Sequence, residues 1–284
     1  MIDYHIHTHH SYDGENTTLD ACIYALRCNL KAIAVTDHFE ANGHNFGGNS
    51  YNPKLAKTES DNAKSIYGNI LQIAHGIELG QPLQNLPVAE KMLNENAFDF
   101  VLASNHNNDN NKDFYYLGSE ISSADTIFTL FNQYFDELLQ IARWGRFNIL
   151  AHLTYPVRYF AQNGINIQIS PHRESFIISD KKVNCNIFAE KIEYIYKELI
   201  KGNKGIEINT SGLFKYNGPT MPDYELVRFY KECGGELITV GSDAHRSHFI
   251  GRGIRHGLDM LKTSGFKYIT VFDKQMPVMI KNYM

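Results

Sequence analysis

The chain has 284 residues, a net charge of −4 and a hydrophobic fraction of 43%. This length and apolar content are enough for a large folded core, and a charged fraction of 20% is unlike that of disordered chains. Lys and Arg form no cluster along the sequence, so we expect binding neither to nucleic acid nor to an anionic membrane.

The N-terminal segment MIDYHIH lacks the basic and apolar stretches of a signal peptide, and no run of about 18 apolar residues predicts a membrane span. The four cysteines form neither a CxxC pair nor the pattern of a secreted disulfide framework. We therefore expect a cytoplasmic protein with reduced thiols. The sequence does not indicate its oligomeric state.

Short apolar, β-branched segments alternate with amphipathic helical patterns along the chain. The predicted strands are 2–6, 32–36, 70–77, 99–104, 148–152, 205–209, 237–241 and 268–272. The predicted helices are 18–29, 54–66, 88–96, 123–143, 187–201, 221–232 and 255–263. Thr17-Thr18 and Ser122-Ser123 are candidate N-caps, and Gly234-Gly235 is a candidate helix stop.

Strand and helix alternate about seven times, which predicts an α/β fold with a parallel sheet. A chain of this length suits one domain, residues 1–284, in which the sheet closes into a (β/α) barrel. A doubly wound open sheet is the alternative, and periodicity does not separate the two. Residues 40–53, 105–119 and 161–184 are predicted to be irregular loops after strand ends, where a barrel has its active site.

His, Asp and Glu residues stand at or just past the ends of the predicted strands. His5 and His7 end the first strand, and the alternation of side chains places both imidazoles on one face. Because the C-terminal ends of parallel strands meet at one mouth of a barrel, we expect these ligands to converge there. The other candidate metal ligands are Asp13, His38, Glu78, His106, His152, Asp243 and His245.

Nine ligands of imidazole and carboxylate type suit Zn, Mn or Fe and exceed what one tetrahedral ion takes. Two or three divalent ions bridged by a carboxylate would use them all. Asp37 points to the opposite side of its strand from His38 and is expected to orient ligands. A structural or metal-sensing module is the non-enzyme alternative, but such sites usually have four Cys or His ligands. The carboxylate-rich set favours a hydrolase, and there is no GxSxG elbow, P-loop or GxGxxG fingerprint to suggest other chemistry.

Six motifs follow one another across nearly the whole chain: HIHTHHSYDG, VTDH, GIELG, SNH, AHL and GSDAH. With them the sequence resembles the polymerase-and-histidinol-phosphatase (PHP) superfamily. Its size, the YDG after HIH and the segment AHLTYPVRY resemble the histidinol-phosphatase branch. The resemblance implies a distorted (β/α)7 TIM-like barrel with a trinuclear metal site.

The resemblance also divides the ligands among three ions, with Glu78 as the bridge between two of them. Some relatives have His where Asp13 stands, and the harder Asp is expected to alter metal preference there. Related phosphatases usually have an apolar residue where Asn105 stands, so the pocket wall beside His106 is expected to differ. The three implied sets are His5, His7, Glu78 and Asp243; Glu78, His106 and His152; and Asp13, His38 and His245.

The implied reaction is hydrolysis of L-histidinol phosphate to L-histidinol and phosphate, in histidine biosynthesis, by a metal-activated water. Asp13 or His245 is expected to assist proton transfer. Arg158 is the first candidate to clamp the phosphate, because a guanidinium can bind two oxygens at once. Arg246, His248 and Lys215 are weaker candidates. Residues available for the imidazole and ammonium of the substrate are Glu40, Phe46, Tyr115 and Tyr116.

Two other activities of the superfamily are alternatives. A phosphodiesterase or 3′–5′ exonuclease needs a basic groove with stacking residues, and the net charge of −4 argues against it. A protein-tyrosine phosphatase would use the same metal site. Turnover of phosphotyrosine peptide and histidinol phosphate would distinguish the two phosphatases.

Overall fold

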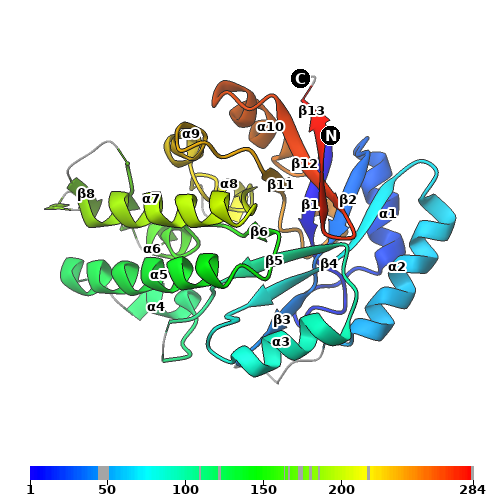
Figure 1. The fold of residues 1–284 in the computed structure, drawn as a ribbon, viewed down its shortest axis with the longest axis horizontal. Helices are drawn as coiled ribbons and strands as arrows, with labels where there is room; N and C mark the ends of the chain where they lie inside the picture. Colours follow the sequence, from blue (N-terminus) through cyan, green and yellow to red (C-terminus); the bar gives the residue numbers. More distant parts are fainter. Residues whose placement is uncertain are drawn as a thin grey trace.

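The centre of the fold is an eight-stranded parallel sheet, in which seven strands have the order β1-β2-β4-β5-β6-β10-β11 and the eighth, β3 (His38–Glu40), pairs with β4 (Figure 1). All residues of the seven strands except Gln72 are buried, as expected of strands covered on both faces. The seven strands are β1 (Ile2–Ile6), β2 (Ala32–Val35), β4 (Gln72–Gly80), β5 (Phe100–Ser104), β6 (Ile149–Leu150), β10 (Gly205–Asn209) and β11 (Ile238–Gly241). This computed structural model describes residues 1–43, 51–108, 110–120, 123–162, 164–165, 167–171, 175–178, 181–184, 186–215 and 218–282.

The first and last strands of this order meet and nearly close the sheet into a barrel. His7 N–H donates to the Ala244 carbonyl at 2.9 Å, and Asp243 N–H donates to the His5 carbonyl at 2.8 Å. Ile6 and Ala244 also form a parallel bridge. The predicted (β/α)7 barrel is confirmed, and the open doubly wound sheet is wrong.

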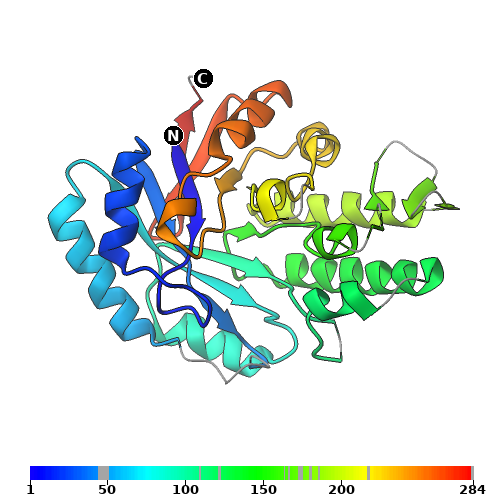
Figure 2. The same ribbon diagram turned by 180° about the vertical axis from the view of Figure 1, so that it is seen from behind.

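Helices cover the outside of the barrel. Helices α1 and α2 lie on one flank, and α5 and α7 run side by side on the opposite flank (Figures 1 and 2). Each of the seven predicted helices is present within three residues at both ends: α1 (Thr18–Arg27), α2 (Pro53–Tyr67), α3 (Leu86–Glu95), α5 (Ala124–Trp144), α7 (Asn186–Lys201), α9 (Tyr224–Glu232) and α10 (Ile254–Thr263). None of the described helices is long and apolar enough to cross a bilayer.

Local sequence explains where these helices begin. Thr17 caps α1 as predicted, in a capping box in which Asp20 N–H donates to Thr17 Oγ1 and Thr17 N–H donates to Asp20. Ser123 is the N-cap of α5, although its side chain makes no capping hydrogen bond. Gly234, at φ 95°, follows the end of α9.

Two predicted loops contain regular structure. Residues 105–119 include most of α4 (Phe114–Glu120), and α6 (Val157–Gln162) runs into the third loop. That loop also contains a small antiparallel sheet of β7 (Ile167–Gln168), β8 (Ser175–Ile178) and β9 (Lys181–Asn184). The remaining short elements are β3 (His38–Glu40), α8 (Gly212–Lys215) and the 3-10 turn Ser247–Phe249.

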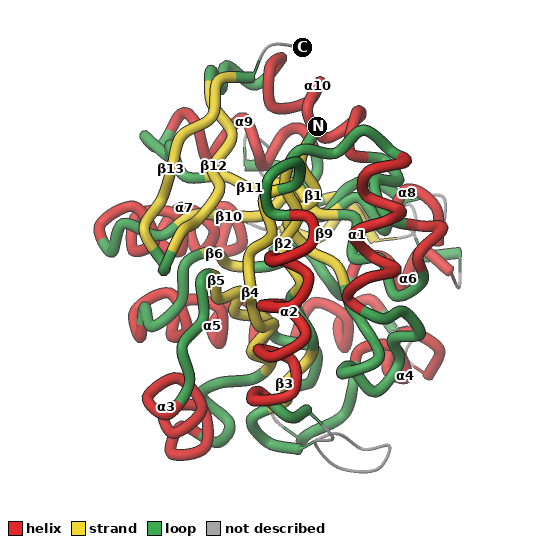
Figure 3. The backbone as a smooth tube through the Cα atoms, turned by 90° about the vertical axis from the view of Figure 1, so that its right-hand side faces the viewer, coloured by secondary structure: helices red, strands yellow, loops and turns green. Residues whose placement is uncertain are grey.

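The predicted strand 268–272 is a strand, but it does not belong to the barrel. It is β12 (Tyr268–Asp273), which forms an antiparallel hairpin with β13 (Met276–Lys281). The turn residues Lys274 and Gln275 both have positive φ, 47° and 65°, as a two-residue hairpin turn requires. Because neither is Gly, Asn or Asp, the sequence contains no hairpin signal at this turn. Figure 3 shows the hairpin beside the two chain termini.

The hairpin packs against the N-terminal end of the barrel strands. Gln275 N–H donates to the Asp99 carbonyl at 2.8 Å, and the rings of Phe100 and Phe272 stack with centroids 5.0 Å apart. The fully buried Tyr4 of β1 joins the two units: its hydroxyl donates to the Phe272 carbonyl at 3.1 Å and accepts from Phe272 N–H at 2.8 Å. The hairpin therefore closes the end of the barrel opposite the strand ends with the metal ligands.

Replacing Tyr4 by Phe should destabilise the protein by about 1–3 kcal/mol, because it leaves the buried N–H of Phe272 without its acceptor. Chemical denaturation measures the change. Tyr268→Phe is the control, since Tyr268 is 41% exposed. Equal stability of the two variants would contradict a role for the Tyr4 hydroxyl in joining the hairpin to the barrel.

Candidate metal centre

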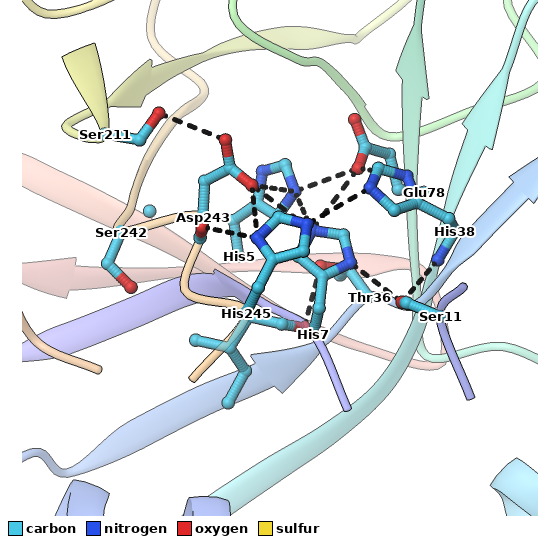
Figure 4. A network of polar contacts seen from close by, with 12 residues as sticks. His5, His7, Ser11, Thr36, His38, Glu78, Ser211, Ser242, Asp243 and His245 are labelled. Carbon is cyan, nitrogen blue, oxygen red and sulfur yellow. Dashed lines mark hydrogen bonds and ion pairs between the residues drawn. The ribbon is translucent and has the colours of Figure 1, made fainter. Parts of the chain in front are cut away.

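The carboxylate of Glu78 lies at the centre of the barrel mouth, fully buried among imidazoles (Figure 4). Strand β4 is longer than predicted and continues through Glu78 to Gly80, where β3 pairs with it and sets His38 opposite Glu78. Glu78 Oε2 lies 3.1 Å from His5 Nε2 and 3.0 Å from His38 Nδ1. Glu78 Oε1 lies 3.1 Å from His106 Nε2 and 2.8 Å from His152 Nε2. One carboxylate thus lies within 3.1 Å of four imidazoles from four different segments, and His7 Nε2 is a fifth neighbour at 3.5 Å.

His5, His7 and Asp243 form one group of potential ligands beside Glu78. His5 and His7 leave β1 on the same side, with their Nε2 atoms 3.0 Å apart. Asp243 Oδ1 lies 3.3 Å from His7 Nε2 and 3.9 Å from His5 Nε2. Asp243 follows β11 at φ 53°, a strained conformation for a residue that is not glycine, and strain of this kind is frequent at functional sites.

Two further groups complete the mouth. His106 and His152 approach the same oxygen of Glu78, with their Nε2 atoms 3.4 Å apart. His245 Nε2 lies 3.1 Å from Asp13 Oδ2 and 3.4 Å from His38 Nε2. Asp13 Oδ1 lies 3.8 Å from His38 Nε2. All nine residues proposed from the sequence as ligands are therefore brought together at the barrel mouth.

Several of these imidazoles have their outer nitrogen held by an acceptor. The Nδ1 atoms lie 2.7 Å from Glu207 Oε1 for His5, 3.0 Å from Ser11 Oγ for His7, and 3.1 Å from Glu40 Oε1 for His106. His245 Nδ1 lies 3.0 Å from the Asp243 carbonyl. A ring that donates through Nδ1 presents the lone pair of Nε2, which is how proteins orient metal-ligating histidines.

The nitrogen contacts also fit divalent ions. In three places, two imidazole nitrogens face each other at 3.0–3.4 Å. Their lone pairs would repel each other unless a proton or a cation lies between the two nitrogens. Mixed imidazole and carboxylate donors are the set that Zn, Mn and Fe prefer. The residues at this mouth can therefore hold divalent metal ions.

The charges at the mouth favour cations. Burial would raise the pKa of Glu78, but His38, His5 and His106 outweigh it and hold the pKa well below its usual value. Burial lowers the pKa of His38, yet Glu78 and Asp13 raise it to about 9. His7, surrounded by His245 and His38 in a buried site, has its pKa lowered well below the usual value. At neutral pH the carboxylate of Glu78 is thus ionised and His7 is neutral, as metal binding requires, whereas His38 is protonated and a bound cation would replace its proton.

Asp37 supports the loop that follows β1. Its Oδ1 accepts from Thr8 N–H at 2.6 Å and from Ser11 Oγ at 2.8 Å, and its Oδ2 accepts from Thr8 Oγ1 at 2.8 Å. Ser11 Oγ in turn contacts His7 Nδ1 and accepts from His38 N–H. Asp37 therefore reaches His7 and His38 through Ser11, as expected of a residue that orients metal ligands.

Sequence reasoning missed Glu207, which contacts two of the predicted ligands. Besides His5 Nδ1, it accepts from His152 N–H through Oε2 at 3.0 Å. Glu207 lies within β10 rather than at its end, so the search of strand ends passed over it. The signal that could have found it is a lone carboxylate inside the otherwise apolar strand GIEIN.

A cavity of about 220 Å³ opens above the metal ligands. Arg158 enters it from α6, buried over the rings of Tyr155 and Tyr159 at 4.5 and 4.8 Å. Its Nη1 donates to Ser211 Oγ at 2.9 Å and lies 3.4 Å from Asp243 Oδ2. Its Nε has no hydrogen-bond partner in the described part of the chain. The cavity is also lined by Tyr12, Asp13, His38, Glu78, His106, Asp113, Tyr115, Tyr116, His152, Asp243 and His245.

Other candidates lie away from this cavity. Arg246 is exposed and forms an ion pair with Glu15, and the exposed His248 packs on Phe249. Glu40 is buried beneath His106, so it meets a ligand and not the cavity. Asn105 is buried outside the lining as well. Phe46 and the side chain of Lys215 lie outside the described residues.

The fold is a nearly closed parallel barrel, and at its mouth imidazoles surround a shared glutamate. This combination is typical of a metal-binding barrel protein. Residues 3–211 match the family model described as "PHP domain", and the chain belongs to this family. The family resemblance read from the motifs is thereby confirmed.

Relatives and solved structures agree with this assignment. The chain is 31% identical over 280 residues to the probable histidinol-phosphatase of Thermotoga maritima, covering 97% of both chains. It is 24% identical to the histidinol-phosphatase of Lactococcus lactis, covering 95% of this chain and 94% of the relative. The crystal structure of the Lactococcus lactis histidinol phosphate phosphatase, complexed with zinc, L-histidinol and phosphate, superposes with a TM-score of 0.71 at 20% identity, covering 98% of both chains. This likeness shows the fold.

Replacing Glu207 by Gln should weaken metal binding by about 10- to 100-fold, the usual effect of removing a group that orients a ligand. A glutamine has one acceptor oxygen and cannot accept from both His5 Nδ1–H and His152 N–H. Competition with a chelator measures the affinity. The exposed Glu95→Gln on α3 is the control, and equal affinities in the two variants would mean that Glu207 does not orient His5.

Proposed function

We propose that this protein is a metal-dependent phosphomonoesterase that hydrolyses L-histidinol phosphate to L-histidinol and phosphate. One observation supports this most strongly: the ligand cluster around Glu78 opens into the same cavity as the buried Arg158. Groups that suit divalent cations therefore face the same space as a guanidinium that suits a phosphate. The relatives named histidinol-phosphatase, matched over almost their full length, support the choice of substrate.

The proposed centre contains two or three divalent ions, of Zn, Mn or Fe. When bound, clustered ions of this kind activate a water as nucleophile and stabilise the charge on the phosphoryl oxygens. Glu78 would help to hold two of the ions, because its Oε1 faces His106 and His152 while its Oε2 faces His5, His38 and His7. Asp13 and His245, 3.1 Å apart at the cavity wall, are the pair nearest to bulk water and are placed to hold a proton for the leaving alcohol.

Arg158 is proposed to bind the phosphate. Ser211, Asp243 and Tyr159 hold its two terminal nitrogens, while the tyrosine rings below it fix its plane. A guanidinium held in this way loses little conformational freedom when it binds an anion. Its pKa is held well above the usual value, since Tyr159, Tyr155 and Asp243 outweigh burial, so it stays a cation.

The part of the cavity at the start of α4 is proposed to bind the organic part of the substrate. It contains Asp113, Tyr115 and Tyr116, next to the metal ligands. A carboxylate with aromatic rings suits a molecule that has an ammonium group and a flat imidazole. We further propose that residues 1–284 act as one domain, since β11, beyond the match to the family model, closes the barrel and leads to Asp243 and His245.

The protein purified with Zn or Mn should release phosphate from L-histidinol phosphate, and His5→Ala/His7→Ala should abolish release, because that variant lacks two ligands of the first ion. A phosphate-release assay measures this. Phosphotyrosine peptide, in the same assay, and single-stranded DNA, followed by release of nucleotides, serve as comparison substrates. No release above the double variant would disprove the phosphatase, and faster turnover of either comparison substrate would disprove the proposed substrate.

Arg158→Ala should raise KM for phosphorylated substrates by about 10- to 100-fold, because a charged hydrogen bond is worth about 1.5–3 kcal/mol. Steady-state kinetics measure the change, and metal analysis verifies that Asp243 still functions as a ligand. Arg246→Ala is the matched control, since Arg246 is exposed and paired with Glu15. An unchanged KM in Arg158→Ala would remove this residue from the phosphate site.

A further inference from the structure

A second group of metal-type ligands lies outside the barrel mouth, between the loop after β1 and helix α2. It consists of His9, His10 and Glu59, whose ligand atoms all lie within 4.8 Å of one another. His9 Nε2 lies 3.3 Å from Glu59 Oε1, and His10 Nε2 lies 3.4 Å from Glu59 Oε2. None of the three lines the cavity above Glu78, so the group is separate from the proposed catalytic site within the part of the chain that the structure describes.

These separations suit a tetrahedral ion. Zn²⁺ binds imidazole nitrogen and carboxylate oxygen at about 2.0–2.1 Å, so two ligands of one tetrahedron lie about 3.3–3.4 Å apart. Each histidine lies at this distance from one oxygen of Glu59, His9 from Oε1 and His10 from Oε2, and one ligand atom from each of the three residues lies within 4.8 Å of the others. With three protein ligands, a fourth position would remain for water on the exposed side, where the side chain of His9 is 42% exposed.

The histidines are oriented as ligands. His9 Nδ1 lies 3.2 Å from the Asn16 carbonyl, an acceptor that fixes the proton on Nδ1 and presents the lone pair of Nε2 to Glu59. His10 is 8% exposed, and its buried Nε2 makes no hydrogen bond to any described residue. A buried imidazole nitrogen with unused bonding capacity, 3.4 Å from a carboxylate oxygen, is a candidate metal ligand.

We propose that His9, His10 and Glu59 form a peripheral binding site for a divalent transition-metal ion, of which Zn²⁺ is the best fit. The ion ties the loop after β1 to helix α2. That loop continues into Ser11, which contacts His7, and into Asp13, which contacts His245. The site therefore stabilises the loop that contains Ser11 and Asp13, although none of its three residues lines the cavity.

The test uses the full chain without an affinity tag, in three forms: wild type, Glu59→Gln, and the control Asp61→Asn. Asp61 lies on the same helix, is exposed and pairs only with Lys57 among the residues described. After saturation with Zn²⁺ and gel filtration, elemental analysis should find about one ion per chain fewer in Glu59→Gln than in the other two.

A second measurement locates the lost ion. Zn²⁺ should slow the modification of His9 by diethyl pyrocarbonate several-fold in wild type and Asp61→Asn, and not in Glu59→Gln, because bound metal occupies Nε2. The exposed His256 on α10 is the internal reference in each sample. Equal ion contents in all three forms would overturn the proposal. A lower content in Glu59→Gln without Zn²⁺ protection of His9 in the wild type would also overturn it, by placing the lost ion at the barrel mouth.

Discussion

The buried carboxylate of Glu78 is the interaction on which the site depends. An ionised carboxylate without partners would be several kcal/mol too unfavourable for the interior of a protein. Here four imidazoles lie within 3.1 Å of it, and they come from β1, β3 and the segments after β5 and β6. Because these partners meet Glu78 only when those strands are side by side, the ionised state of Glu78 depends on the folded sheet.

Closure of the barrel therefore matters more for function than any single element. Asp243 and His5 are neighbours only because β11 pairs with β1, through the bond from Asp243 N–H to the His5 carbonyl. At the other end, the β12–β13 hairpin and Tyr4 seal the strands against water. The ligands at the mouth are thus held by backbone pairing on one side and by a packed core beneath them.

The sequence predicted the ligands well because they follow a simple rule: they stand where parallel strands end, and those ends converge. It predicted the seven helices for a similar reason, since amphipathic periodicity and caps such as Thr17 are local signals. It placed strand 268–272 in the wrong sheet, because the turn at Lys274 and Gln275 has none of the usual hairpin residues. Regular structure in the segment after β6 was also missed, because its strands are short and alternate weakly.

Two orienting residues, Glu207 and Glu40, escaped sequence reasoning for a different physical reason. Glu207 lies inside a strand and Glu40 lies on the short strand beside β4, and each reaches a ligand through Nδ1. Nothing in the sequence fixes which of the two nitrogens of an imidazole is held, since that depends on the acceptor that folding brings behind the ring. Candidate metal ligands can therefore be found from one-dimensional spacing, whereas acceptors such as Glu207 and Glu40 behind the imidazole rings can be found only from the folded structure.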